Sequence, residues 1–543
     1  MTRTKKLIIF LVGICASCCA GADAASYEHI PFDSTQRYSR LVIDARLNDF
    51  YANKNQMGFQ TFTEGGSVIK APAGGSKVKF DYVPGLVAKA LIEVVDYYQS
   101  QPWARPWFYS VEWYGNTFVS GVPSAGGSLD DLNATKMYIG LYNLTSEGKA
   151  FENETTASNA LFAMETATRG LTDHNNHYSI AASTLEGASG GWFHKKSYVN
   201  QMWLDGQYMG PALLAQLNNY GYGIDGTKDA ELIARQFEIC WNYLWNDEEK
   251  LLYHAMTASP GDSYSQDWQG VSATDGIYHS AEYWGRACGW YFLALVDVLE
   301  QLEISASTKG EEADDELRDI LRTQLNALAV GLAARQDPTT GCWYQLLAHD
   351  GNFYADSYQG RSYPKTYNYL ESSATCIFTA AYFKGMRLGF FDEDYTDVAI
   401  KAYRGVVEQF LVRNTSDPTD LHLIGCCRSA GLGGSNRRDG SAAYYLLGSD
   451  VSVTSIDNPQ TEGKVFGSFI LASTEYERRF LPIAEEGIEK IYPDAAPHDS
   501  FLHAYDLLGR RIINSSLISN ISVRRRSSLI RIGNQTGNII LVH

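Results

Sequence analysis

Apolar residues recur at helical spacing in one segment after another between residues 36 and 487. A repeat of three to four residues places the apolar side chains on one face of a helix, so this pattern predicts helices rather than strands. Clusters of Gly, Pro, Asn and Asp separate the segments. The clearest predicted helices are Leu86–Tyr98, Leu132–Leu144, Ala230–Leu244, Trp290–Leu302, Leu317–Ala334, Ala374–Leu388 and Val398–Leu411.

The pattern predicts about ten to twelve helices in one uninterrupted block. A four-helix bundle is too small for a block of this length, so we expect a toroid of helical hairpins and an all-α fold class. The segments do not follow a strict sequence period, which argues against a solenoid. We therefore assign residues 26–491 to one helical domain.

The first 25 residues have the pattern of a secretory signal peptide. Arg3, Lys5 and Lys6 precede the apolar run 7–19, and small residues follow at 22–24. The run is too short to remain as a membrane span. We expect export to the periplasm, the cell surface or the medium.

The other end of the chain differs in composition from the helical block. Residues 492–497 (Tyr-Pro-Asp-Ala-Ala-Pro) read as a linker, and residues 498–543 hold six Arg and two Asp in a chain of net charge −17. Short apolar runs between Ser and Asn turns predict a small β segment there. The stretch 504–512 resembles the C-terminal sorting domain of the type IX secretion system, which implies secretion machinery as a partner; the alternative is a generic β tail.

The composition narrows the possible functions. A net charge of −17 argues against a nucleic-acid-binding protein, which needs a basic face. No long apolar run follows the N-terminus, which argues against a polytopic membrane protein. Aromatic residues make up 13% of the chain, and both sugar-binding clefts and large cores use aromatic rings. The six cysteines beyond the signal peptide lack metal-ligand spacing, so we prefer buried thiols to disulfides, although export permits a disulfide.

The segment 200–211 carries the first candidate for chemistry. Asp205 stands in an apolar, aromatic stretch, where an unpaired charge is costly. We expect Asp205 either to cap the helix that Pro211 begins or to act as a general acid. The second role is possible because aromatic rings that shield a carboxyl from water raise its pKa. Trp203 and Tyr208 offer the ring walls.

The segment 284–290 carries the second candidate. Arg286 and Trp290 lie four residues apart, on one face if the segment is helical. The guanidinium could bind a carboxylate in a forked geometry with the indole stacked on a sugar ring, or it could be a structural Arg bonded to loop carbonyls.

The remaining polar candidates have structural interpretations when each is taken alone. His194 and His254 are lone histidines of the ordinary buried kind. In the run 128–131, Asp130 or Asp131 is expected to cap the helix from Leu132 onward. The sequence has no zinc spacing, phosphate loop or nucleophile elbow, so it implies no metal or cofactor.

Several blocks, in order along the chain, resemble the unsaturated uronyl hydrolases of glycoside hydrolase family 105 and its relative, family 88. The blocks run in family order from about residue 129 to 473, so the resemblance extends over most of the chain. The blocks are 129–133 (LDDLN), 193–195 (FHK), 201–209 (QMWLDGQYM), 253–255 (YHA), 284–286 (WGR), 289–290 (GW), 336–338 (QDP), 343–345 (WYQ), 369–373 (YLESS) and 467–473 (GSFILAS).

This resemblance implies an (α/α)6 barrel and a hydrolase for the oligosaccharides that polysaccharide lyases produce. It assigns Asp205 as the general acid/base and Asp130 as the second active-site Asp. The substrate-binding positions that it implies are Tyr82, His194, Trp203, Met209, His254, Arg286 and Trp290.

The implied reaction is hydration of a vinyl ether. Asp205 protonates C4 of the unsaturated uronic acid, charge develops at C5, and the ionised carboxylate activates the water that attacks C5. Ordinary glycosidases instead place two carboxyls around the anomeric carbon. Asp130 is expected to act on Asp205 as a like charge or to bind sugar hydroxyls, and Arg286 to bind the substrate carboxylate.

The chain also departs from the family pattern. Met256-Thr257 stands where the family has Trp-Asp, and Ala287-Cys288 where it has Gly-Asn. Segments 103–127 and 346–367 are longer than usual. These changes affect substrate identity more than reaction type.

The leading hypothesis is an unsaturated rhamnogalacturonyl or galacturonyl hydrolase in pectin breakdown. The alternatives are a hydrolase for ulvan or glycosaminoglycan fragments, a lyase or inverting glycosidase on the same barrel, and a silent glycan-binding protein.

Overall fold

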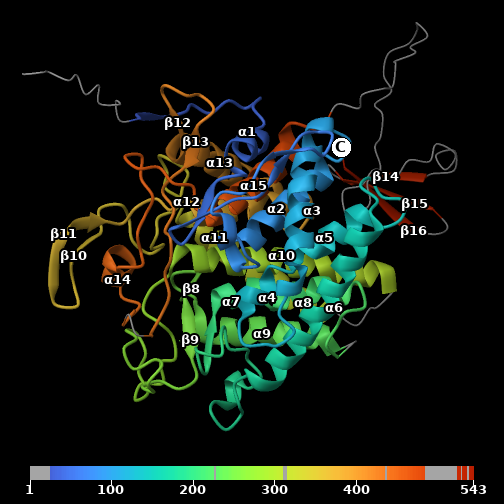
Figure 1. Ribbon diagram of the computed structural model, residues 1–543. Helices are drawn as coiled ribbons and strands as arrows, with labels where there is room; N and C mark the ends of the chain where they lie inside the picture. Colours follow the sequence, from blue (N-terminus) through green and yellow to red (C-terminus); the bar gives the residue numbers. More distant parts are fainter. Residues whose placement is uncertain are drawn as a thin grey trace, which may run out of the picture.

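The computed structural model describes residues 25–225, 228–309, 315–434 and 437–483, and three strands between residues 522 and 542. Its main body is helical (Figure 1). Among the described residues, an inner ring forms because each of six helices packs on the next and the last packs on the first. These helices are α2 (Tyr82–Tyr97), α5 (Lys136–Thr145), α8 (Pro211–Asn218), α10 (Gly285–Lys309), α12 (Ser372–Arg387) and α15 (Gly463–Phe480).

A second set of helices covers the inner ring from outside. Each outer helix packs on the inner helix to which it is joined, except that α1 packs on α15 from the other end of the domain. The outer helices are α3 (Arg105–Phe118), α6 (Glu154–His177), α9 (Asp229–Leu244), α11 (Asp315–Ala334), α13 (Thr396–Phe410) and α1 (Tyr38–Arg46). This arrangement is an (α/α)6 barrel, and it confirms the predicted fold class.

Hydrogen bonds to one buried carboxylate close the barrel. The backbone N–H and the hydroxyl of Ser39 in α1 donate to Oε1 and Oε2 of Glu477 in α15, at 2.9 and 2.7 Å. The phenol of Tyr98, just beyond α2, donates to the same Oε2 at 2.6 Å. Glu477 therefore joins the first and the last helix of the barrel to the first inner helix.

Short helices and small sheets fill the connections. The short helices include α4 (Leu129–Asn133), α7 (Leu204–Met209) and α14 (Ala442–Leu447). The paired strands of the barrel domain are antiparallel: β1 (Tyr27–His29) with β12 (Leu411–Asn414) and β13 (Leu421–Leu423), β2 (Phe50–Ala52) with β3 (Asn55–Met57), β4 (Thr61–Phe62) with β5 (Val68–Lys70), β6 (Gln201–Trp203) with β9 (Ala255–Thr257), β7 (Trp245–Asn246) with β8 (Leu251–Leu252), and β10 (Tyr354–Tyr358) with β11 (Arg361–Tyr367).

The predicted helix Leu132–Leu144 is divided in the structure. Helix α4 ends at Asn133 and α5 begins at Lys136. The inner helix α2 passes very close to this bend, because a Cβ added at Gly85 would lie 2.4 Å from the Cβ of Ala134. The bend therefore separates α4, which carries Asp130, from the inner helix that follows.

Many of the aromatic side chains are buried in the core. Trp284, Trp290 and Trp343 are among the largest fully buried side chains. All six cysteines of the described residues are buried and unpaired, which confirms the preference for buried thiols. The described part of the chain has no helix that is long and apolar enough to cross a membrane.

The two ends of the chain are described only in part. The signal peptide and the linker 492–497 lie outside the described residues, apart from Ala25, and so does the stretch 504–512 that resembles a sorting domain. Within 498–543 the structure describes β14 (Ser522–Arg526), β15 (Leu529–Asn534) and β16 (Gly537–Val542), which form an antiparallel sheet. The predicted β segment is present in these strands.

Candidate active site

Asp205 lies in the first turn of α7, where strand β6 passes into the helix. The pairing of β6 with β9 sets this position, since Trp203 faces Ala255 and the Leu204 N–H donates to the His254 carbonyl at 3.1 Å. Oδ2 of Asp205 is buried, and its polar contact within the described chain is with Nε2 of His254, 3.3 Å away. The side chain is 14% exposed, so the oxygen open to a ligand is Oδ1. The helix-cap interpretation is wrong.

His254 lies against the buried oxygen of Asp205. Its Nε2 is 3.3 Å from Oδ2 of Asp205, and its Nδ1 is 2.6 Å from the hydroxyl of Tyr445. Burial lowers the pKa of His254 and outweighs the opposing effect of Asp205, so the imidazole is neutral at pH 7. Burial also raises the pKa of Tyr445 well above its ordinary value. The phenol thus keeps its proton and can donate to Nδ1, which leaves the imidazole proton on Nε2, facing Asp205.

Asp130 has very different surroundings. It lies in α4, whose N-cap is Ser128 because the Ser128 hydroxyl accepts from the Asp131 N–H; the expectation that Asp130 or Asp131 caps the helix is therefore wrong. Its two oxygens lie 3.2 Å from His194 Nε2 and 2.5 Å from Lys195 Nζ. Burial raises the pKa of Asp130, but His194 and Lys195 outweigh burial and hold it well below its ordinary value.

A stack of rings connects the two carboxyl groups. His194 and Tyr198 both stack on Trp203, with ring centroids 5.1 and 4.6 Å from that of Trp203 and interplanar angles of 3° and 5°. The centroids of His194 and Tyr198 are themselves 6.1 Å apart, so these two rings lie side by side against Trp203. The His194 ring can approach α7 because position 206 is glycine, where an added Cβ would lie 3.2 Å from Nδ1. His194 therefore contacts Asp130 on one side and the helix of Asp205 on the other.

His174 of α6 fixes both segments that carry the Asp130 cluster. Its Nδ1 accepts from the Gly127 N–H at 3.1 Å, and its Nε2 is 2.8 Å from the carbonyl oxygen of Phe193. Gly127 precedes the N-cap of α4, and Phe193 precedes His194. Burial lowers the pKa of His174 to about 4, which keeps the ring in the neutral form that makes both bonds.

Arg286 supplies a buried positive charge. It stands at the start of α10, is 2% exposed, and donates from one terminal nitrogen to the Cys427 carbonyl at 2.6 Å and to the Ser373 hydroxyl at 3.1 Å. The same nitrogen lies 3.6 Å from Oε1 of Glu371. The structural interpretation of Arg286 is therefore confirmed for this nitrogen, and a role toward a substrate stays a prediction.

Tyr82 is placed among the charged groups of the site. Arg286, Asp130 and Asp205 all act on its hydroxyl electrostatically, while burial raises the pKa of the phenol well above its ordinary value. Its ring stands edge-on to Trp290, with centroids 6.3 Å apart. The phenol of Tyr82 thus keeps its proton and is neutral.

Six of the seven residues expected to bind substrate are buried, all except Tyr82, and Trp290 and Met209 belong to the main hydrophobic core. Trp290 is fully buried and its indole stacks on Tyr208, with centroids 4.7 Å apart. The prediction that this indole stacks on a sugar ring is therefore wrong in this structure, because protein rings occupy its surroundings. Met209 is 1% exposed and belongs to the hydrophobic core. Trp290 and Met209 are therefore part of the core on which the site is built.

Sequence reasoning missed three residues of the site. Lys195 stands in the family block 193–195 and forms the shorter of the two contacts to Asp130. Tyr445 and Glu371 reach His254 and Arg286 from distant segments. Glu371 carried a usable signal, because it stands in the family block 369–373, and in the structure it also caps α12 by accepting from the Ala374 N–H; Tyr445 had none.

Comparisons with known proteins agree with this geometry. Residues 68–480 match the model of Glycosyl Hydrolase Family 88. A solved family 105 glycoside hydrolase from C. acetobutylicum is 26% identical, with 82% of this chain and all of that chain covered and a TM-score of 0.58. A possible family 105 member from Salmonella enterica shares the fold at 18% identity, with 82% and 95% covered and a TM-score of 0.54. Protein Atu3128 of Agrobacterium fabrum is 31% identical over 204 residues, which are 35% of this chain and 76% of the relative.

Proposed function

From the premise that the chain belongs to glycoside hydrolase family 88, we propose that it removes the terminal unsaturated uronic acid from oligosaccharides made by polysaccharide lyases. The proposal concerns a sugar with a C4=C5 double bond conjugated to its carboxylate. Asp205 is the group that protonates C4, and Asp130 is the second active-site carboxylate.

The observation that carries this proposal is the contrast between the two carboxyl groups. Lys195 and His194 contact Asp130, whereas the ionisable side chain in contact with Asp205, within the described chain, is His254, whose imidazole is neutral. A cation stabilises the ionised form of a neighbouring carboxyl and a neutral imidazole does so far less, so the proton donor is Asp205.

The first step transfers the proton of Asp205 from Oδ1 to C4. The C4=C5 π electrons form the new C4–H bond, and positive charge develops at C5, shared with the ring oxygen. His254 Nε2–H faces the buried Oδ2 and stabilises the carboxylate that remains. This leaves Oδ1 as the base for the next step.

In the second step, a water attacks C5 and gives its proton to Asp205. The resulting hemiketal opens by cleavage of its C5–O5 bond, and the hemiacetal left at C1 releases the rest of the oligosaccharide. One carboxyl thus serves as acid and then as base, which general acid–base catalysis allows when the group returns to its starting state.

We further propose that the substrate is the unsaturated rhamnogalacturonan disaccharide. The blocks resemble family 105, and a family 105 structure matches the chain. The half-buried ring of Tyr198, which stacks on Trp203, offers an apolar surface for the methyl group of a 6-deoxy sugar. An assay across unsaturated disaccharides from several lyases tests this choice; equal turnover of ulvan or glycosaminoglycan fragments would contradict it.

The reaction itself is tested by its optical and isotopic signatures. Turnover should remove the ultraviolet absorbance of the conjugated enoate and, in deuterium oxide, place one deuterium at C4 of the product. A rise in absorbance would indicate a lyase, and binding without conversion would indicate a silent glycan-binding protein. A product without deuterium at C4 would rule out the proposed role of Asp205.

Export through the segment 1–25 and recognition of the C-terminal segment by secretion machinery are also proposals. The sequence patterns of the two ends support them. N-terminal sequencing of protein recovered from outside the cytoplasm should begin near residue 26, and deletion of residues 498–543 should stop release without reducing the specific activity.

A further inference from the structure

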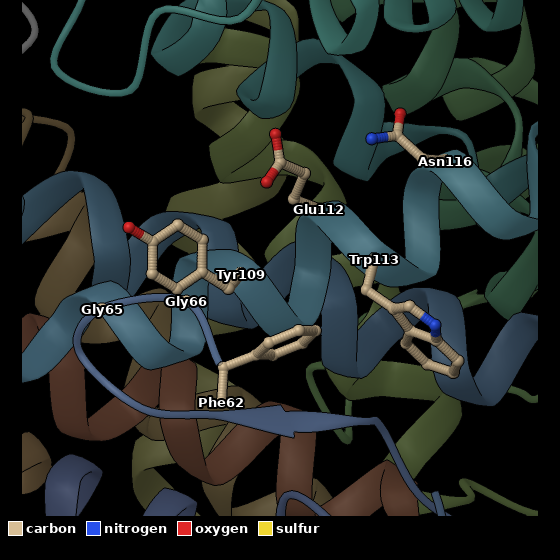
Figure 2. A pocket seen from close by; sticks show the side chains of 7 residues that line it. All are labelled: Phe62, Gly65, Gly66, Tyr109, Glu112, Trp113 and Asn116. Atoms are coloured by element: carbon tan, nitrogen blue, oxygen red, sulfur yellow. The ribbon is translucent and has the colours of Figure 1, made fainter. Parts of the chain in front are cut away.

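A cavity of about 290 Å3 lies between the β4–β5 hairpin and the outer helix α3 (Figure 2). Its lining consists of Phe62, Gly65, Gly66, Tyr109, Glu112, Trp113 and Asn116. None of these residues belongs to the Asp205 site. The cavity is therefore a separate feature that the proposed hydrolysis does not use.

The helical wall of this cavity is one stripe of α3. Tyr109, Glu112, Trp113 and Asn116 are spaced three, four and seven residues from the first of them, which places their side chains on one face of the helix. Figure 2 shows the Tyr109 and Trp113 rings on either side of the Phe62 ring, with the Glu112 carboxylate above the rings in this view. The stripe alternates two rings with two polar groups.

The hairpin supplies the opposite wall. Phe62 stands edge-on to Tyr109, with centroids 6.1 Å apart. The Gly66 N–H donates to the Thr63 carbonyl at 2.9 Å, and Gly66 has φ of +83°, which favours glycine at that position. Gly65 has no such requirement, and a Cβ there would meet only Thr63 Oγ1, at 3.8 Å. The hairpin thus turns without filling the cavity.

Hydrogen bonds with α6 and its N-cap residue hold the two polar side chains of the cavity in place. Oε1 of Glu112 accepts from the Thr156 hydroxyl at 2.8 Å and from the Asn153 amide at 3.0 Å. The Asn116 amide donates to Thr156 Oγ1 at 3.0 Å, and its oxygen accepts from Asn159 at 3.0 Å. These contacts orient both side chains before any ligand arrives, and within the described chain they leave Oε2 of Glu112 without a donor.

We propose that this cavity binds one neutral pyranose ring of a glycan. Aromatic rings pack against the C–H faces of a sugar, and oriented carboxylate and amide groups accept its hydroxyl protons. A volume of about 290 Å3 is at the lower end of the range for small-molecule sites, which fits a single ring. The charged side chain in the lining is an acid, Glu112, so a uronate would bring two negative charges together.

The experiment compares three methyl glycosides that carry different groups at C6: a galactoside (CH2OH), a rhamnoside (CH3) and a galacturonide (COO−). Saturation-transfer-difference NMR on the full chain measures their binding, and titration gives the affinity. We expect the two neutral glycosides to bind and the galacturonide to give no transfer that depends on the cavity.

Two variants and one control assign the signal to the cavity. Trp113→Ala removes one ring and should weaken neutral-sugar binding by about five- to tenfold. Gly65→Leu places a side chain in the free space and should have a similar or larger effect. The control is Ile69→Ala, which changes an exposed side chain of the same hairpin that does not line the cavity, and it should bind as the original protein does.

All three variants should retain the turnover of unsaturated disaccharide, because the cavity shares no residue with the Asp205 site. Neutral-sugar binding that persists in Gly65→Leu and Trp113→Ala would overturn the proposal, as would cavity-dependent binding of the galacturonide. If the original protein failed the hydrolase assay, the NMR experiment would still test sugar binding in the cavity, because it detects binding without turnover.

Discussion

Nε2 of His254 lies 3.3 Å from Oδ2 of Asp205. This contact gives the two carboxyl oxygens different roles, because Oδ2 is enclosed beside an imidazole while Oδ1 stays open. A carboxyl arranged in this way can give and recover a proton through one oxygen while the other is held still.

Asp205→Asn should abolish turnover while the fold is retained. The amide cannot supply a proton to C4, so we expect kcat to fall by about a hundred- to ten-thousand-fold. The decay of enoate absorbance measures the rate, and circular dichroism measures the fold. Near-original turnover in this variant would contradict the role of Asp205.

Tyr445→Phe should reduce kcat by about tenfold, because the phenol holds Nδ1 of His254 and thereby keeps the proton on Nε2. The matched control is Tyr444→Phe, which removes the neighbouring buried phenol of α14; that phenol bonds to Gly431 and Asp450 instead. Equal losses in the two variants would show that only the packing of α14 matters.

Lys195→Met should reduce kcat/KM by about ten- to a hundredfold, because Asp130 loses the closer of its two partners. Lys196→Met, at the exposed neighbouring position, serves as the control. In a double-mutant cycle with Asp130→Asn, the two losses should not add, since each variant removes the same contact. Additive losses would indicate that Lys195 acts on the substrate without Asp130.

Stability should fall as the pH drops from about 6.5 to about 4, the pKa of folded His174. An unfolded histidine binds its proton near pH 6.5, so within this window protonation favours the unfolded chain. The shift corresponds to a loss on the order of 3 kcal/mol in the free energy of unfolding. Urea titrations at several pH values measure the slope, which should decrease in His174→Gln and stay the same in His177→Gln, whose side chain is exposed.

Glu477→Gln should destabilise the barrel by about 2–3 kcal/mol, because a carboxylate that accepts three hydrogen bonds becomes an amide that contributes two donors of its own. Chemical denaturation measures the loss. Glu64→Gln changes an exposed turn residue and serves as the control. A loss no larger than that of the control would show that the contact between α1 and α15 does not depend on this carboxylate.

The helices could be predicted from the sequence because they follow a local rule. The pattern predicted Ala230–Leu244 and Leu317–Ala334, and the structure has Asp229–Leu244 and Asp315–Ala334. The pattern could not show the bend after Asn133, which depends on the approach of α2 to Ala134, a tertiary contact.

The site could be predicted only in part. Asp130, His194 and Asp205 stand in blocks that resemble a family, and the structure brings them together around Trp203. The partners of two other site residues are brought in by the fold: Tyr445 reaches His254 across 191 positions and Cys427 reaches Arg286 across 141. Helical spacing carries no information about such pairs.

The hydrogen bonds that join Glu477 to Ser39 and Tyr98 have a consequence for biogenesis. Ser39 lies 438 positions before Glu477 in the chain, so vectorial synthesis produces an incomplete arc until the last barrel helix has emerged. The apolar edges of that arc have no partner during this interval, which makes them natural targets for chaperones. Asp205 is made long before the ring can close, so an arrested or truncated product would carry every catalytic side chain and still be inactive.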